Sequence, residues 1–490
     1  MVFHNLRDFM GEMEQYGELK TLNGVGWDLD MSSIAEVVFT QGKDPKPMLV
    51  FDDVPGYEKG YRTLFSLLGS PRRVAKTLNV AEDADRWSLL NNWRRKSRDI
   101  KLVPHKFVNS GPVQENLMTG DKIDLWKFPI PRFHELDGGR YIGTCHAVVQ
   151  KDPDSGWVNL GTYRVMVVDR NHVTIHALEA KHGSTIMTTK YFEKRRVMPI
   201  AIAIGIDPTL WFASTYPTVP FGVSEYDYAG GVKGEPVEVI EGPYSGIPVP
   251  AYAEIVIEGE CHPGEVADEG PFGEWCGYYA NLGREPVPEP LIRVKAIHYR
   301  DNPILTCAHM HVPPCEITLI RAVTMSVAIW NLLESMETPG IRGVWTHESG
   351  AGRLFNVISL KQLYAGHAQR TGLIASQVPK DAGGYTVVVD DDIDPLNLEE
   401  VVWAMATRVD PERSIQILPY CRTGSADARV PIAEKKKYQT TPKPLMASRI
   451  VVNACQPYEH KSEWYPVSRM SPELRQKTIE KWGAILEKLI

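Results

Sequence analysis

Two glutamates that flank a Gly/Pro-rich turn are the densest group of residues able to do chemistry together. Glu269 and Glu274 enclose a Gly-Pro-Phe-Gly sequence in segment 269–274. Glycine and proline make a helix improbable there, but a tight turn can direct both carboxylates toward one point. In a pocket of low dielectric constant, two such carboxylates split their pKa values, so that one stays ionised while the other holds a proton. The alternative is a surface turn with two solvated acids.

An arginine inside a β-rich segment is the second candidate. Arg164 ends the segment 157–164 (WVNLGTYR) and is followed by the apolar run 165–168. A planar guanidinium binds a carboxylate through two parallel hydrogen bonds. Most single arginines are surface cations, which is the alternative here. The apolar residues that follow make that alternative less convincing, so Arg164 is a candidate for holding a substrate carboxylate.

Three further residues could bind a divalent ion. Asn159, His182 and Glu225 offer one nitrogen and two oxygen ligands, a set that suits Mn²⁺ or Mg²⁺ better than a thiol-seeking metal. Their spacing along the chain is not diagnostic, and a single histidine is more often a satisfied core residue. The spacing alone therefore leaves the metal site open.

Two other segments contain residue types that often bind metal ions, but a structure without a metal explains each of them better. Segment 309–317 (HMHVPPCEI) has two histidines but only one thiol and two adjacent prolines, which favours a pocket-lining loop over a zinc site. Segment 389–394 (VDDDID) lacks the glycine and closing glutamate of a calcium loop, and fits a strand end that leads into a helix. The sequence contains no Walker A motif, no dinucleotide-type glycine fingerprint and no GxSxG elbow.

Composition narrows the class of protein. The 490 residues are 43% hydrophobic and 23% charged, and 54 Lys and Arg against 61 Asp and Glu give a net charge of −7. This balance is typical of a globular protein and argues against general binding of nucleic acid. No apolar run reaches the length of a membrane span, and the seven cysteines form no CxxC pair. We expect reduced thiols and a cytoplasmic protein that uses neither membrane nor nucleic acid as a partner.

Hydrophobic periodicity divides the chain into four parts. Residues 1–115 are predicted to be α/β, and residues 116–316 contain short β-rich runs separated by Gly/Pro turns, which indicates a barrel or sandwich-like domain. Residues 317–336 predict a long helix with few charges. Residues 337–490 return to an α/β pattern.

Several local elements are specific enough to predict. Leu6, Phe9, Met10 and Met13 have helical spacing, with Asn5 as the expected N-cap. Strands are predicted at 47–51, 385–389 and 449–452, and a helix at 398–408. A final helix should begin after Ser471 with Pro472 at its first position. Its apolar stripe consists of Leu474, Trp482, Ile485, Leu486 and Leu489.

Read together and in order, these motifs resemble the UbiD family of prenylated-flavin-dependent (de)carboxylases. The resemblance is carried by NLGTYR at 159–164, KHGS at 181–184, PFGVSEYDYAGG at 220–231 and EGPFGEWCGYY at 269–279. It covers nearly the whole chain and is most specific between residues 157 and 280. The resemblance implies a central split β-barrel that binds the flavin. An N-terminal α/β region and a C-terminal α/β oligomerisation domain, joined by the long helix, would flank this barrel.

The resemblance also implies roles for individual residues. Arg164, Glu269 and Glu274 match the catalytic Glu–Arg–Glu network of the family. Asn159, His182 and Glu225 match the ligands of a Mn²⁺-type ion that bridges to the cofactor phosphate. The potassium site would be formed by Ala213, Tyr216 and Glu225. The cofactor-binding residues would be Asn159, Gly161, Thr162, Tyr163, Arg164, Lys181, His182, Thr215, Tyr216 and Glu225, and the substrate pocket would contain Leu178, Trp275, His309, His311 and Cys315.

The implied activity is reversible, non-oxidative decarboxylation of an aromatic, heteroaromatic or acrylic acid, with prenylated FMN as the electron sink. Arg164 would orient the carboxylate and Glu274 would donate a proton. A separate flavin prenyltransferase would supply the cofactor, and the chain would form a homodimer or homohexamer. Two alternatives stay open: a metal-dependent hydrolase that uses the Asn159, His182 and Glu225 set, and a non-catalytic flavin-binding or assembly subunit.

Overall fold

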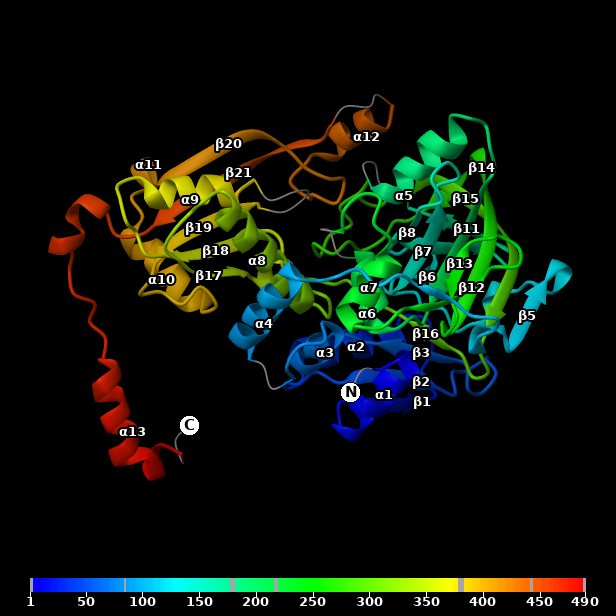
Figure 1. The fold of residues 1–490 in the computed structure, drawn as a ribbon, viewed down its shortest axis with the longest axis horizontal. Helices are drawn as coiled ribbons and strands as arrows, with labels where there is room; N and C mark the ends of the chain where they lie inside the picture. The colour runs from blue at the N-terminus through cyan, green and yellow to red at the C-terminus, as the bar shows by residue number, and fades with distance from the viewer. Residues whose placement is uncertain are drawn as a thin grey trace.

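The computed structural model describes residues 3–82, 85–176, 181–215, 219–377, 383–440 and 444–487. Figure 1 shows a smaller N-terminal sheet, a large curled central sheet and a separate C-terminal sheet. The N-terminal sheet has the strand order β1-β2-β3-β16. Its strands are β1 (Leu19–Asn23), β2 (Met48–Asp52), β3 (Arg62–Phe65) and β16 (Ile304–Thr306), and its helices are α1 (Leu6–Gln15), α2 (Asp30–Gln41), α3 (Pro71–Thr77) and α4 (Arg86–Arg98).

The first helix follows the sequence prediction. The Asn5 side chain accepts hydrogen bonds from the backbone N–H groups of Arg7 and Asp8 at 2.9 and 3.2 Å, which is the expected N-cap. The four apolar residues of α1 that share one face are buried: Leu6, Phe9, Met10 and Met13. Beyond α1, Gly17 has φ +72°, a conformation that favours glycine.

The central sheet has nine strands, and all its pairs are antiparallel. The order is β6-β9-β10-β15-β14-β11-β7-β8, with β5 paired to β15. The strands are β5 (Asn116–Thr119), β6 (Arg140–Gly143), β7 (His146–Lys151), β8 (Val158–Gly161), β9 (Val165–Asp169), β10 (His172–Ile175), β11 (Met198–Ile204), β14 (Ile255–Glu269) and β15 (Val287–Tyr299).

Chain connectivity explains why this sheet curls. Strand β8 is one edge of the sheet and β9 is next to the other edge, yet only residues 162–164 join them. Four Cα steps span at most about 14 Å, so the two edges must approach one another. The result is an open barrel (Figure 1), as the family resemblance implied, where the sequence pattern alone had left a barrel or a sandwich open. Arg164 lies in the short connection that bridges its opening.

Smaller elements surround the curled sheet. A three-stranded sheet has the order β13-β12-β4, and helices pack near the β8–β9 connection. These elements are β4 (Lys106–Phe107), β12 (Glu238–Glu241), β13 (Pro248–Pro250), α5 (His182–Thr185) with the π-helical turn η4 (Ile186–Phe192), α6 (Pro208–Thr215) and α7 (Glu225–Lys233).

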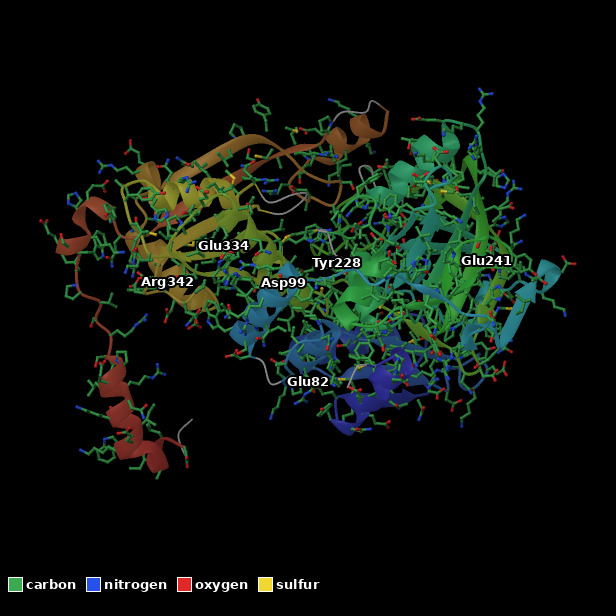
Figure 2. All side chains as sticks on the ribbon, in the orientation of Figure 1. Glu82, Asp99, Tyr228, Glu241, Glu334 and Arg342 are labelled. Carbon is green, nitrogen blue, oxygen red and sulfur yellow. The ribbon has the colours of Figure 1, made fainter. Side chains whose placement is uncertain are left out.

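The predicted long helix is α8 (Thr318–Ser335), which leads from the central sheet to the C-terminal sheet. It packs against α4, where Glu334, labelled in Figure 2, forms ion pairs with Arg94 and Arg98. Twelve of its residues are buried. A helix that is apolar on most of its surface needs cover on several sides, and α8 obtains that cover from α3 and α4 and from β17 (Ile341–Thr346) and α9 (His367–Ala375) of the C-terminal domain.

The C-terminal sheet has the order β17-β18-β19-β21-β20, with parallel central pairs and antiparallel edges. Its strands are β17 (Ile341–Thr346), β18 (Phe355–Leu360), β19 (Tyr385–Asp390), β20 (Ile415–Arg422) and β21 (Met446–Ala454). The accompanying helices are α9 (His367–Ala375), α10 (Leu398–Arg408), α11 (Pro411–Ser414) and α12 (Ile432–Thr440). The mixed α/β and β fold class expected from the sequence is therefore confirmed.

The final helix, α13 (Pro472–Leu486), lies apart from the rest of the chain (Figure 1). The Ser471 hydroxyl accepts a hydrogen bond from the Leu474 N–H at 3.1 Å, which confirms the predicted cap. Leu474, Trp482 and Ile485 are about half exposed and Leu486 is half-buried, so most of the apolar stripe is open to solvent. Leu489 lies outside those residues.

Over the ranges described, no helix combines the length and apolar character needed to cross a membrane.

Candidate active site

A cavity of about 740 Å³ lies where the central sheet, the start of α8 and the C-terminal domain meet. Its volume is in the usual range for a small-molecule or cofactor site. The β8–β9 connection, α5, α6 and α7 contribute one part of its wall. Residues 272–275, α8 and the β20–β21 region contribute the other part.

Arg164 is held between the two predicted glutamates at the wall of this cavity. Its Nε and Nη2 donate to the two carboxylate oxygens of Glu269 at 2.8 and 2.7 Å, and its Nη1 donates to Glu274 Oε1. The three side chains are 9%, 0% and 12% exposed, respectively. Glu274 lines the cavity together with Arg164, whereas Glu269 supports the arginine from behind.

Electrostatics keep Arg164 and Glu269 charged. Burial alone would raise the pKa of Glu269, but the charge and hydrogen bonds of Arg164 outweigh it, so that the pKa is lowered. Burial likewise opposes the charge on Arg164, but Glu274 and Glu269 outweigh burial and raise the arginine pKa. Glu269 is therefore a fixed carboxylate, and Arg164 is a fixed cation that faces the cavity.

Close backbone packing sets the position of the glutamate turn. A Cβ atom on Gly138 would lie 1.8 Å from the carbonyl oxygen of Gly270, so only glycine fits beside this turn. Phe272 places its ring 5.1 Å from the guanidinium carbon of Arg164. The Glu274 N–H donates to the carbonyl of Tyr278 at 2.9 Å. These contacts fix the direction in which Glu274 enters the cavity.

His176, which was not predicted from sequence, belongs to the same group. It follows β10, donates its backbone N–H to the Arg164 carbonyl at 3.1 Å and contacts the Glu289 carboxylate through Nδ1. One ligand atom each of His176, Glu269 and Glu289 lies within 4.8 Å of the others, and all three residues are buried. The charge of His176 also helps to lower the pKa of Glu269, so His176 and Glu289 support the carboxylate that positions Arg164.

The residues predicted to bind the cofactor come together at the cavity. Those that line it are Asn159, Gly161, Thr162, Tyr163, Arg164, Lys181, His182, Thr215 and Glu225. Trp275, predicted for the substrate pocket, lines it too. Tyr216 and Leu178 lie outside the described residues, and Ala213 is buried within α6.

The proposed ion ligands have the chemistry of an incomplete cation site. Within the described ranges, the buried Nδ2 of Asn159 has no hydrogen-bond partner. Glu225 accepts a hydrogen bond from the Leu160 N–H at 2.7 Å, and burial raises its pKa to about 8. A buried carboxylate that lacks a cationic partner takes up a proton. The Glu225 carboxylate and the amide oxygen of Asn159 therefore fit a hard cation, which would restore the charge of Glu225, whereas the unpartnered Nδ2 is a hydrogen-bond donor and cannot bind one.

The two histidines of segment 309–317 do not take the predicted position. Met310 lines the cavity, whereas His309, His311 and Cys315 are absent from the lining formed by the described residues. The His309 ring lies 4.8 Å from His134 and 5.2 Å from His311, and burial holds its pKa well below the usual value. Adjacent residues of an extended segment point in opposite directions, and here the methionine takes the inward direction.

Two further arginines line the cavity without a signal from any recognised motif. Arg321 lies in the first turn of α8 and Arg353 follows β17, and both approach the ring of Trp275. In segment 317–336, Arg321 and Glu334 are the charged residues. The sequence therefore contained a signal for Arg321, because a cation in a mostly apolar helix is unusual.

The comparisons with known proteins agree with this geometry. Profiles of the UbiD family, described as 3-octaprenyl-4-hydroxybenzoate carboxy-lyase, match residues 10–90 (N-terminal domain), 106–313 (Rift-related domain) and 318–454 (C-terminal domain). The chain is 30% identical to a phenolic acid decarboxylase of Bacillus subtilis (strain 168), over 86% of this chain and 88% of that protein. It is 32% identical to a pyrrole-2-carboxylic acid decarboxylase of Pseudomonas aeruginosa, over 83% of both.

A solved structure is similar along almost the whole chain. It is an evolved dimeric form of the UbiD-class enzyme HmfF from Pelotomaculum thermopropionicum, in complex with prFMN. The TM-score is 0.78 at 26% identity, and the match covers 96% of this chain and 98% of that one.

Proposed function

Because the chain belongs to the UbiD family of carboxy-lyases, we propose that it catalyses reversible, non-oxidative decarboxylation of a planar aromatic or heteroaromatic acid. An acrylic acid, conjugated in the same way, belongs to the same class. The observation that carries the proposal is Arg164 held between Glu269 and Glu274 at the wall of a 740 Å³ cavity. The names of the two relatives, which specify phenolic acids and pyrrole-2-carboxylic acid, support an aromatic substrate.

The cavity residues would hold prenylated FMN. Support comes from the prFMN complex of HmfF and from the cavity-lining positions of residues 159–164, Lys181, His182 and Thr215. When bound, prenylated FMN accepts the electron pair that the departing CO₂ leaves behind, which no amino-acid side chain does well. Asn159, His182 and Glu225 would hold a Mn²⁺-type ion near the phosphate. Ala213, Tyr216 and Glu225 would hold potassium.

The residues of the chain would position the substrate and supply the proton. Glu269 occupies Nε and Nη2 of Arg164, so Nη1 is the atom that can exchange Glu274 for a substrate carboxylate. Arg164 would then orient that carboxylate. Glu274, displaced from the arginine but still in the cavity, would take up a proton from solvent and deliver it to the carbon that CO₂ leaves.

The proposal is tested by preparing the protein together with a flavin prenyltransferase, the partner that would supply the cofactor. Mass spectrometry of the bound cofactor should give the mass of prenylated FMN, and the protein should absorb visible light. A panel of benzoic, hydroxybenzoic, heteroaromatic, cinnamic and 2-keto acids, tested anaerobically, should show turnover of the conjugated acids. A protein that binds no flavin, or that turns over only 2-keto acids, would refute the proposal.

We also propose that the chain works as a homodimer or homohexamer through α13. The half-exposed Leu474, Trp482 and Ile485 lie on a helix that projects from the body of the chain, as Figure 1 shows. The HmfF structure named above is a dimer, which supports an oligomer. Light scattering at micromolar concentration should give a multiple of 55.0 kDa. The mass of a single chain would exclude this assembly.

A further inference from the structure

Two histidines meet outside the active-site cavity. The Nε2 atoms of His134 and His309 lie 3.2 Å apart, and neither residue is part of the cavity lining formed by the described residues. His309 is buried and His134 is half-buried. The two residues come from distant segments, since His134 precedes β6 and His309 follows β16. Tertiary packing therefore builds a pair of imidazole nitrogens that face one another.

A carboxylate completes the group. Glu36, on α2, places its Oε2 atom 4.0 Å from Nε2 of His309. One ligand atom each of Glu36, His134 and His309 lies within 4.8 Å of the other two. Zinc takes such nitrogen and oxygen ligands at about 2.0–2.2 Å. Two nitrogens on a tetrahedral zinc ion are about 3.3 Å apart, which is close to the separation of the two histidines.

The protonation state of His309 suits metal binding. Burial, and after it the charges of His134 and His311, lower the pKa of His309 well below its usual value. A neutral imidazole keeps a lone pair on one ring nitrogen, whereas an imidazolium has none. A hydrogen bond between the two rings would explain the same distance, but it needs no carboxylate beside the pair.

The groups around His134 match the outer shell of a metal site. Its Nδ1 atom faces Oδ2 of Asp137 at 3.6 Å, and metal-bound histidines usually direct their second ring nitrogen at a carboxylate or carbonyl. Asp137 is held in turn by the Tyr279 hydroxyl at 3.1 Å and by the Gly273 N–H at 3.3 Å. This chain of contacts would set the orientation of the His134 ring.

A fourth ligand lies nearby. The ring of His311 is 5.2 Å from that of His309, and its Nδ1 donates to the Val312 carbonyl at 2.9 Å. A proton on Nδ1 leaves the lone pair on Nε2. Burial lowers the pKa of His311, while the hydrogen bond to Val312 and the charge of Glu36 oppose that shift. His311 is thus a neutral imidazole close to the same carboxylate.

We propose that Glu36, His134 and His309 bind a structural zinc ion, with His311 within reach as a fourth ligand. Segment 309–317 alone holds too few ligands for zinc, and the structure supplies the others from two distant segments. The ion would join these segments behind the glutamate turn, where a Cβ atom on Gly273 would lie 3.0 Å from the His134 ring. This site is separate from the cavity and does not depend on the proposed function.

Competition between the full-length protein and a chromophoric chelator of known zinc affinity tests the inference. The His182→Ala protein serves as the background, because it lacks a ligand of the ion proposed for the cofactor site. Adding Glu36→Ala or His134→Ala should weaken zinc binding about 100-fold or more, since losing even a group behind a ligand costs about 10-fold to 100-fold. The Glu36 side chain is 42% exposed, so Glu36→Ala should leave the fold intact.

Two matched controls should leave the zinc affinity unchanged. Glu14→Ala removes an exposed glutamate from α1, and His172→Ala removes a histidine whose Nδ1 lies 2.9 Å from Asp169 at the surface. A structural ion also stabilises the folded state. Saturating zinc should therefore raise the thermal unfolding midpoint of the background protein and of both controls, but not that of the protein with Glu36→Ala.

X-ray absorption at the zinc edge identifies the ligands directly. We expect nitrogen and oxygen neighbours at about 2.0–2.2 Å together with the scattering of imidazole rings. Sulfur neighbours at about 2.3 Å would place the ion at cysteines and overturn the inference. Absence of zinc binding in the background protein, or an equal affinity with and without Glu36→Ala, would also overturn it and leave a hydrogen bond between the two rings.

Discussion

Two buried arginine–glutamate clusters in this chain consist of the same residue types but have different surroundings. In the N-terminal region, Arg73 donates from Nη1 to Glu18 at 2.7 Å, from Nε to the Leu67 carbonyl at 3.1 Å and from Nη2 to the Lys46 carbonyl at 2.6 Å. In the central sheet, Arg164 donates to two glutamates. Both arginines are at least nine-tenths buried.

The difference lies in whether a partner borders a cavity. Glu18 is only 3% exposed, and the partners of Arg73 are backbone carbonyls and a carboxylate that cannot move away. Burial lowers the pKa of Arg73 to about 10, although Glu18 and Glu316 oppose the shift. Arg164 has an additional carboxylate, and that carboxylate lines an open space. Burial and ion pairing therefore do not identify a catalytic arginine, whereas an exchangeable partner at a cavity does.

Matched Arg→Lys changes at the two positions should separate the two roles most strongly. Arg164→Lys keeps the charge but loses the two parallel hydrogen bonds to Glu269, so the remaining donors are misplaced. A misplacement of about 1 Å can reduce turnover on the order of 10²-fold. We expect this loss in steady-state decarboxylation while the flavin stays bound. Turnover close to that of the unaltered enzyme would show that Arg164 is only a structural cation.

His182 and Glu225 line the same cavity as Arg164. Their proposed partner is an ion that can leave, not a fixed group of the protein. Changing either residue to alanine should weaken divalent-metal binding about 10-fold to 100-fold and reduce the bound flavin. Elemental analysis and visible absorbance measure the two occupancies. Full occupancy of both in either variant would show that the metal assignment is wrong.

Arg73→Lys should give the opposite result to Arg164→Lys. Lysine cannot reach Glu18 and both carbonyls together, so at least one buried acceptor loses its donor, at about 1–3 kcal/mol. Denaturant unfolding should show this loss of stability, whereas the folded fraction should keep its turnover per molecule. A drop in turnover without a loss of stability would remove the distinction between the clusters.

Glu316, close to Arg73, should make folding depend on pH. It accepts hydrogen bonds from the backbone N–H groups of His309 and Leu67 at 2.7 and 2.9 Å, yet burial raises its pKa from 4.5 to about 7. Between these values the folded state keeps a proton that the unfolded state releases, so stability falls as pH rises through this window. The total is roughly 3 kcal/mol, or about 1.4 kcal/mol per pH unit.

The Glu316→Gln variant isolates this contribution. Unfolding at pH 5 and pH 7.5 should show a larger loss of stability with rising pH in the unaltered protein than in the variant. The variant itself should be less stable at pH 5, because its amide group faces one of the two backbone donors. Identical pH slopes in the two proteins would show that Glu316 does not titrate in this window.

The sequence predicted the parts of this molecule that local pattern determines. The face of α1 that contains Leu6 and Met13 and the caps at Asn5 and Ser471 depend on neighbouring residues, and the structure confirms them. The cofactor-side residues were recognised as motifs, and those that the structure describes line one cavity, apart from Ala213 and Glu269. The motif did not reveal which of Glu269 and Glu274 faces the cavity, since that depends on how the turn packs against Gly138.

Long-range packing accounts for the rest. Strand β16 joins the N-terminal sheet although it follows the central sheet in sequence, and no local signal specifies this return. The inward direction of Met310 rather than His309 or His311 is set by the strand-like alternation of one short segment. The proximity of Arg321 and Arg353 depends on how α8 docks against the C-terminal sheet.

The most direct test of the central claim is the turnover of the Glu274→Gln variant loaded with prenylated FMN. The amide keeps the shape of the side chain but cannot deliver a proton, and general acid catalysis contributes about 10²–10⁴-fold. CO₂ release from an accepted aromatic acid, measured with the cofactor quantified in the same sample, should fall by that factor while flavin occupancy stays the same. Decarboxylation within a few-fold of the unaltered enzyme would contradict the account.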